Sequence, residues 1–100
     1  MKIEFTPEAE LHVGEIDAWW RENRPEAPDL FARELSHVLT LATVAPHASA
    51  SYSSASGAAY RRLLLPRARN HVYFVIDAER ATLVVHAVWG GPRRDGPVLP

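Results

Sequence analysis

Residues 71–91 read HVYFVIDAERATLVVHAVWGG, two strand-like runs joined by a short connection. In the first run Val72, Phe74 and Ile76 share one face, because successive side chains of a strand point to opposite sides. The second run, 82–89, is apolar on both faces, which is typical of a strand inside a sheet. The connection is short enough for a hairpin, so the two runs are predicted to pair antiparallel.

A third strand-like run, 60–65, precedes this hairpin and is separated from it only by residues 66–70. Such a short connection predicts a second antiparallel pairing and therefore a three-stranded meander. Gly90, Gly91 and Pro92 are expected to end the last strand, and an irregular tail follows.

The N-terminal part of the chain predicts a strand and a helix. Residues 2–5 alternate polar and apolar, and Thr6-Pro7 is typical of a helix cap followed by the first helical residue. Asn23-Arg24-Pro25 is expected to end this helix. Its apolar stripe consists of Ala9, Val13, Ile16 and Trp20.

A second amphipathic helix is expected after a break over 25–28, with Asp29 as its cap. Its apolar face consists of Phe31, Leu35, Val38 and Ala42, widened by Leu30, Leu39 and Leu41. Pro46 is expected to end it, and residues 47–57, rich in serine and alanine, are predicted to form a loop. Two helices joined by so few residues are predicted to lie antiparallel.

The order of these elements predicts an α+β domain, with an N-terminal strand and an antiparallel helical hairpin packed on a twisted antiparallel sheet (β-α-α-β-β-β). One hundred residues are enough for one core, so residues 1–100 are expected to form a single domain. The chain has no cysteine, which excludes disulfides, thiolate metal sites and cysteine nucleophiles. No apolar run approaches the roughly 18 residues of a membrane span, so a cytoplasmic protein without membrane partners is expected.

The net charge of −1 hides an asymmetry along the chain. Residues 1–45 hold nine acids against four bases, whereas residues 46–100 hold seven bases, all arginine, against three acids. Arginine suits bidentate recognition of phosphate or carboxylate, so a polyanion or an acidic protein is a plausible partner for the second half. The alternative is that arginine in place of lysine reflects the composition of the genome.

Several catalytic classes find no motif in this sequence. The five histidines lack the helical pairing of zinc sites, although His71 and His86 lie on neighbouring predicted strands. The serine-rich segment lacks a nucleophile elbow, and the scattered glycines form no phosphate-binding loop. We therefore expect no metal site and no cofactor.

Arginine in aromatic company is the remaining signal, and this mixture suits a nucleic acid or an enzyme bound to one. The residues concerned are Tyr60, Arg61, Arg62, Arg67, Arg69, His71, Tyr73, Trp89, Arg93 and Arg94. The alternative is that the aromatic rings pack in the core and the arginines are solvated. Of the adjacent pair Trp19 and Trp20, Trp20 is expected in the core, because successive helical residues point about 100° apart.

Several segments together resemble the ParE/RelE superfamily of toxins from type II toxin–antitoxin modules. They are Phe5-Thr6-Pro7-Glu8-Ala9, Trp19-Trp20, Asn23-Arg24-Pro25, Ala27, Leu39-x5-Ala45-Pro46, Tyr60-Arg61-Arg62-Leu63, Val72-Tyr73-Phe74-Val75-Ile76-Asp77 and Val88-Trp89-Gly90-x2-Arg93-Arg94. The resemblance covers residues 3–95 and implies the fold expected above. It also implies a bacterial cytoplasmic setting, a growth-arresting target and a cognate antitoxin that wraps the toxin in a hetero-oligomer.

The superfamily contains two kinds of activity. RelE-like members cut mRNA on the ribosome with a basic cluster, whereas ParE-like members inhibit DNA gyrase, a topoisomerase, and lack that cluster. Arg61 matches one RelE-like basic position, but Leu63 and Asn70 stand where further bases are expected. Losing charged groups of the cluster removes stabilisation at the scissile phosphate, so the resemblance favours the ParE-like branch.

Three functions follow as hypotheses. The preferred one is a ParE-like toxin without catalytic residues, whose target-binding residues are Arg61, Arg62, Arg67, Arg69, Arg93 and Arg94. The second is a RelE-like endoribonuclease, in which the roles fall to Arg61, Arg62, His71, His86, Arg93 and Arg94. The third is a non-toxic remnant that only binds antitoxin. The antitoxin is expected at an open sheet edge and in a groove that involves Trp19, Leu30 and Leu41.

Overall fold

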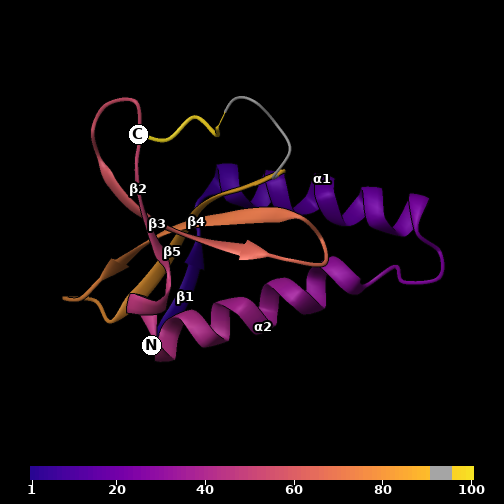
Figure 1. The fold of residues 1–100 in the computed structure, drawn as a ribbon, viewed down its shortest axis with the longest axis horizontal. Helices are drawn as coiled ribbons and strands as arrows, with labels where there is room; N and C mark the ends of the chain where they lie inside the picture. The colour runs from indigo at the N-terminus through magenta and orange to yellow at the C-terminus, as the bar shows by residue number, and fades with distance from the viewer. Residues whose placement is uncertain (91–95) are drawn as a thin grey trace.

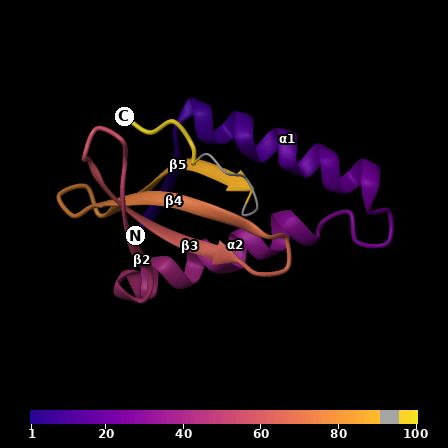
Figure 2. The ribbon, with the colours of Figure 1, turned by 45° about the horizontal axis from the view of Figure 1, so that its top comes forward.

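The computed structural model describes residues 1–90 and 96–100. Its elements are β1 (Lys2–Phe5), α1 (Pro7–Asn23), α2 (Leu30–Val44), the 3₁₀ helix η1 (Pro46–Ala48), β2 (Ala50–Ser53), β3 (Ala59–Leu65), β4 (Asn70–Asp77) and β5 (Thr82–Gly90). In Figure 1, α1 and α2 run in opposite directions, as their short connection predicted, and Figure 2 shows the sheet lying beside this helical hairpin. The α+β class and the β-α-α-β-β-β order are confirmed.

The five-stranded sheet has the order β1-β5-β4-β3-β2 and is mixed. The meander β3-β4-β5 is antiparallel as predicted, and β5 lies inside the sheet, which explains why both of its faces are apolar. The prediction of a wholly antiparallel sheet is wrong at one edge, where β1 pairs parallel to β5, with Lys2 opposite Thr82. Turns dictate direction only for strands that follow each other closely, and β1 and β5 are separated by most of the chain.

A second correction concerns residues 47–57, which were predicted to be a loop. This segment contains part of η1 and the whole of β2, which pairs antiparallel with β3 and places Tyr52 opposite Tyr60. Alanine and serine carry little of the hydrophobic alternation by which a strand is recognised. The backbone ladder and the one large residue, Tyr52, therefore define a strand that the local pattern does not reveal.

The helix caps also differ from each other. The Thr6 hydroxyl accepts a hydrogen bond from the Ala9 amide at 3.1 Å, as expected of a cap. Asp29 precedes α2, but its side chain makes no capping hydrogen bond, so that prediction is wrong. Its backbone ψ of 8° departs from the extended conformation in which a capping side chain reaches the amides of the next turn.

The core lies between the helical hairpin and one face of the sheet. The buried residues of this cluster are Ala9, Phe31, Leu35, Val38, Leu39, Ala42, Leu65, Val72, Phe74, Leu83, Val85 and Val88. Val13, Ile16 and Trp20 pack against it, so both predicted stripes face the core, whereas Leu41 at the edge of the second stripe is 53% exposed. Among the described residues, no helix is long and apolar enough to cross a membrane.

The turn between β4 and β5 holds Ala81 in the left-handed region, with φ of 47°. An L-residue with a Cβ pays about 1 kcal/mol or more for this conformation, whereas glycine does not. We expect Ala81→Gly to raise the free energy of unfolding by up to about 1 kcal/mol, measured by urea denaturation. Ala78→Gly in the same turn, where φ is not positive, is the matched control, and an equal gain there would contradict the explanation.

Candidate functional site

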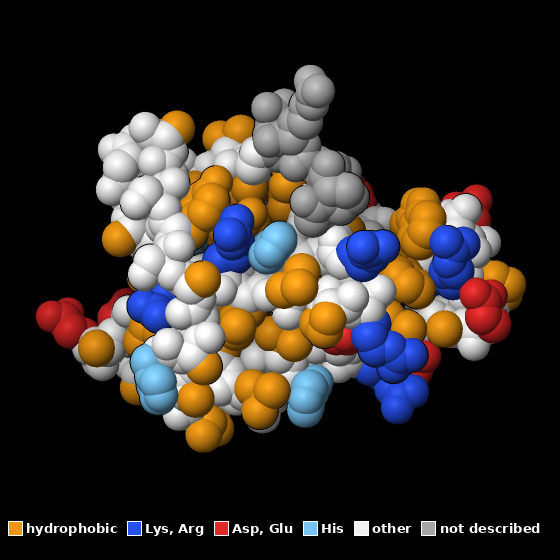
Figure 3. All heavy atoms as spheres, in the orientation of Figure 1, with side chains coloured by type: hydrophobic (Ala, Val, Ile, Leu, Met, Phe, Trp, Pro, Cys, Tyr) orange, Lys and Arg blue, Asp and Glu red, His pale blue; other side chains and the backbone are white. Residues whose placement is uncertain are grey.

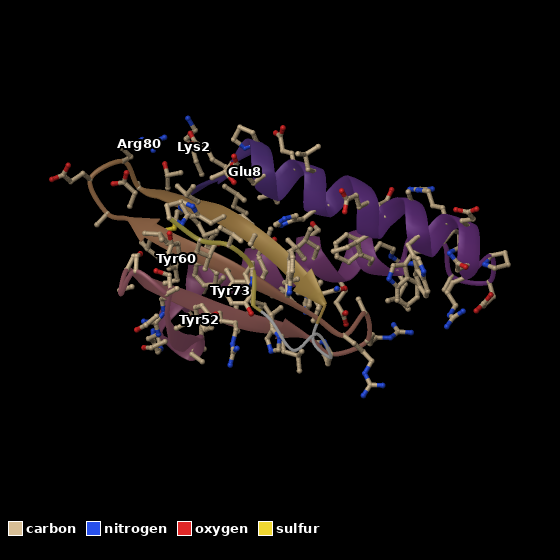
Figure 4. All side chains as sticks on the ribbon, turned by 90° about the horizontal axis from the view of Figure 1, so that it is seen from above. Lys2, Glu8, Tyr52, Tyr60, Tyr73 and Arg80 are labelled. Carbon is tan, nitrogen blue, oxygen red and sulfur yellow. The ribbon has the colours of Figure 1, made fainter. Side chains whose placement is uncertain are left out.

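Three tyrosines from three neighbouring strands gather on the face of the sheet that points away from the helices, here called the outer face. Tyr52 lies opposite Tyr60, and the rings of Tyr52 and Tyr73 make an edge-to-face contact with centroids 4.9 Å apart. Figure 4 shows the three labelled side chains together. Tyr60 and Tyr73 are buried, and Tyr52 is half-buried at the edge. They form an aromatic platform, a surface suited to stacking against flat groups or covering apolar ones.

Arg62 and His71 border this platform. Arg62 lies directly opposite Tyr73, and its guanidinium carbon is 5.3 Å from the centre of the Tyr52 ring, a cation–π contact. The His71 ring lies 6.3 Å from the Tyr73 ring. Burial, and secondarily the charge of Arg62, lower the pKa of His71. The outer face therefore presents one fixed cation beside a neutral imidazole.

His86 lies on the same face but contacts a different tyrosine. The register of β4 and β5 shifts between Tyr73 and Phe74, so that His86 falls in a bulge, and its ring packs edge-to-face on Tyr60 at 5.2 Å. Burial lowers the pKa of His86, although the Glu8 carboxylate opposes the shift. Among residues 1–90 and 96–100, no three side chains of the metal-binding types come together.

The C-terminal residues cover part of the platform. Leu99 is only 8% exposed and belongs to the same apolar cluster as Tyr60, Tyr73 and Ala87. The Tyr60 hydroxyl donates a hydrogen bond to the Pro100 carbonyl oxygen at 3.0 Å. This role of Leu99 was missed at the sequence level, because a single leucine in an irregular tail has no pattern to mark it.

Arg61, the adjacent residue, lies on the opposite side of the sheet. It pairs with Phe74, whose ring is in the helix-facing core, and its guanidinium donates to the carbonyl oxygens of Pro46 and Ser49 at 3.0 and 2.8 Å. It also donates to the hydroxyl of Ser49, which is buried. Arg61 therefore anchors η1 to β3 and does not join Arg62 on the outer face.

The other predicted target-binding arginines are dispersed. Arg67 and Arg69 lie in the turn between β3 and β4 and are exposed there. Arg93 and Arg94, named for both target binding and catalysis, lie outside the described residues, and their roles stay predictions. The described arginines therefore occupy three places: the helix-facing side, the outer face and the turn.

The predicted antitoxin contacts also separate. Trp19, Leu30 and Leu41 line three different hollows, of about 600, 490 and 480 Å³ respectively. Trp19 is 47% exposed and Leu41 is 53% exposed, whereas Leu30 is half-buried. The structure does not bring the three residues into one groove. The open edge strand β2, which the sequence did not reveal, is one of the two ends of the sheet.

Comparison with known proteins adds no family assignment. No protein-family model matches this chain, and a search of the curated proteins gives no match either. The inferences about function below therefore come from the residues, the fold and the resemblance.

The lowered pKa values of His71 and His86 predict a pH dependence. Their ordinary value is 6.5, so below it the unfolded chain takes up protons that the folded chain resists. We expect these histidines to contribute a loss of stability as the pH falls from about 7.5 to about 5, seen as a lower urea midpoint. The double variant His71→Gln/His86→Gln is expected to flatten the curve. His37→Gln, at an exposed position of α2, is the control for the substitution itself.

Proposed function

We propose that this protein is the toxin of a bacterial type II toxin–antitoxin module, closer to the ParE-like than to the RelE-like branch. It acts in the cytoplasm by inhibiting a DNA topoisomerase, gyrase, and a cognate antitoxin neutralises it in a hetero-oligomer. The helical hairpin on one face of a sheet is the arrangement that the resemblance implies, and this agreement supports the proposal.

The position of Arg61 is the observation that favours the ParE-like branch. This is the residue that matches a RelE-like basic position, and its guanidinium is occupied by the backbone of η1 on the helix-facing side. Cleavage of RNA through the ribose hydroxyl needs a base, an acid and positive charge at the phosphate. Among the described residues of the outer face, Arg62 is accompanied by two histidines whose lowered pKa values disfavour the charged form that an acid requires.

The platform offers a binding mode that needs no catalysis. Tyr52, Tyr60 and Tyr73 present contiguous aromatic surface, with Arg62 fixed at the edge by its contact with Tyr52. Aromatic and arginine side chains are the residues that most often dominate the binding energy of protein interfaces. Inhibition by binding to an enzyme therefore suits this face.

The test is inducible expression in a bacterium that lacks the antitoxin, with DNA supercoiling and mRNA integrity followed in the same cells. We expect growth arrest with supercoiling lost and mRNA intact. Codon-linked mRNA cleavage before any change in supercoiling would establish the RelE-like alternative instead. Unaffected growth at confirmed protein levels would leave only the non-toxic, antitoxin-binding remnant.

Arg62→Ala is the informative variant in this assay. We expect it to relieve growth arrest while the protein stays folded, because Arg62 lies at the exposed margin of the platform and holds no other backbone segment. Arg80→Ala, on the turn between β4 and β5, is the matched control for the loss of one arginine. Relief of arrest by both variants alike would show that net charge, and not the platform, matters.

A further inference from the structure

The hollow at Trp19 has the features of a binding site that is separate from the outer face. It has a volume of about 600 Å³ and lies where the end of α1 approaches the turn between β3 and β4. We call it the Trp19 hollow, and its principal side chains are Trp19, Trp20, Arg24, Arg67, Arg69 and Asn70. Figure 3 shows basic side chains gathered around this end of the molecule with hydrophobic side chains between them.

The aromatic wall of the hollow is rigid and partly uncovered. Trp19 is 47% exposed, and its ring stands edge-to-face against Trp20 with centroids 5.7 Å apart. Trp20 in turn packs on the core, so the exposed ring has a fixed support. A large apolar surface held in place without a covering group is the usual anchor point for an apolar side chain of a partner.

Cations from two elements surround this wall. The Arg24 guanidinium lies 5.2 Å from the centre of the Trp19 ring, and Arg67 and Arg69 come from the turn. The turn is fixed by α2, because the Glu34 carboxylate accepts hydrogen bonds from the backbone amides of Arg67 and Ala68, the latter at 2.8 Å. The backbone that carries Arg67 and Arg69 is therefore held in place before any ligand arrives.

Asn70 adds an unsatisfied acceptor. It lines the hollow, is only 7% exposed, and its side-chain oxygen has no hydrogen-bond partner among the described residues. Buried polar atoms nearly always have a partner, so an orphan at the wall of a hollow indicates a ligand donor. A peptide N–H is a donor of this kind.

We propose that the Trp19 hollow docks an acidic amphipathic peptide segment of a second protein. An aliphatic or aromatic side chain covers Trp19, carboxylates pair with the arginines, and a backbone N–H reaches Asn70. A nucleic acid fits less well, because Glu15 lines the same hollow and α1 carries a line of acids that repels a polyanion. These acids are Glu8, Glu10, Glu15, Asp17 and Glu22. The inference goes beyond the proposed function and does not depend on the protein being a toxin.

The test uses the full chain and synthetic probes of defined chemistry. The main probe is a peptide of about twelve residues that alternates glutamates with leucines in a helical pattern. One control peptide replaces the leucines with serine, and another replaces the glutamates with lysine. A poly-deoxythymidine strand tests the nucleic-acid alternative. Binding is followed by calorimetry and by tryptophan fluorescence, and sedimentation reports any self-association.

We expect only the glutamate–leucine peptide to bind, and the double variant Arg67→Gln/Arg69→Gln to weaken it about tenfold or more. Trp19→Ala is expected to weaken it to a similar extent, whereas Arg21→Gln, an exposed arginine of α1 outside the hollow, leaves it unchanged. Tighter binding of the DNA strand, a self-associated protein that excludes the peptide, or equal binding by the Arg67/Arg69 variant would each overturn the proposal.

Discussion

Replacing Arg61 with alanine is expected to lower the free energy of unfolding by about 3 kcal/mol, because a charged donor with several acceptors is lost and the acceptors stay buried. The guanidinium donates to the carbonyl oxygens of Pro46 and Ser49 and to the Ser49 hydroxyl. Ser49 is only 7% exposed, so water does not readily replace the lost donor. Urea denaturation of the purified protein measures the effect.

Two further variants separate this structural role from the loss of a charge. Arg61→Lys keeps the charge but not the planar fork, so it is expected to recover only part of the stability. Arg62→Ala removes an arginine at the next position, on the other face, where only the cation–π contact with Tyr52 is lost, and it is expected to cost less than about 1 kcal/mol. Equal destabilisation by Arg61→Ala and Arg62→Ala would contradict the anchoring role.

This pair of variants also bears on how the toxicity assay is interpreted. If Arg61→Ala abolishes growth arrest, the loss of folded protein explains it, and a catalytic role does not follow. The same outcome with Arg62→Ala, in a protein of normal stability, points to the outer face itself. The stability measurement therefore has to accompany each growth experiment.

The amphipathic helices and the meander were predictable from the sequence because their signals are local. The stripe from Ala9 to Trp20 and the alternation around Val72 and Phe74 each repeat over several turns or residues, and these faces meet in one core. The parallel pairing of β1 with β5 and the existence of β2 depend on partners far away in the chain. No pattern within four residues of alanine and serine specifies such a partner.

The candidate site was predictable only in part, for the same reason. Strand alternation requires Arg61 and Arg62 to face opposite ways, but the sequence does not say which of them faces the helices. Tyr52 belongs to the platform although its segment was predicted to be a loop, and Leu99 reaches the platform from the tail. These are contacts between distant segments, and only the arrangement of the whole chain defines them.

Phe74→Ala is expected to be the most destabilising of the substitutions considered, with a loss of about 4 kcal/mol. The ring is fully buried at the centre of β4 and belongs to the cluster that joins the sheet to both helices, so its removal leaves a cavity bounded by rigid elements. A small domain has about 5–15 kcal/mol of stability in total, so this variant is expected to be partly unfolded at physiological temperature.

Leu64→Ala on the neighbouring strand is the matched control for this prediction. Leu64 is 49% exposed, so its truncation is expected to cost less than about 1 kcal/mol, although leucine loses as many methylene groups there as in the core. Thermal and urea denaturation compare the two variants directly. Similar losses at both positions would mean that the outer side of β3 is covered in solution, and self-association of the chain would then be the first property to measure.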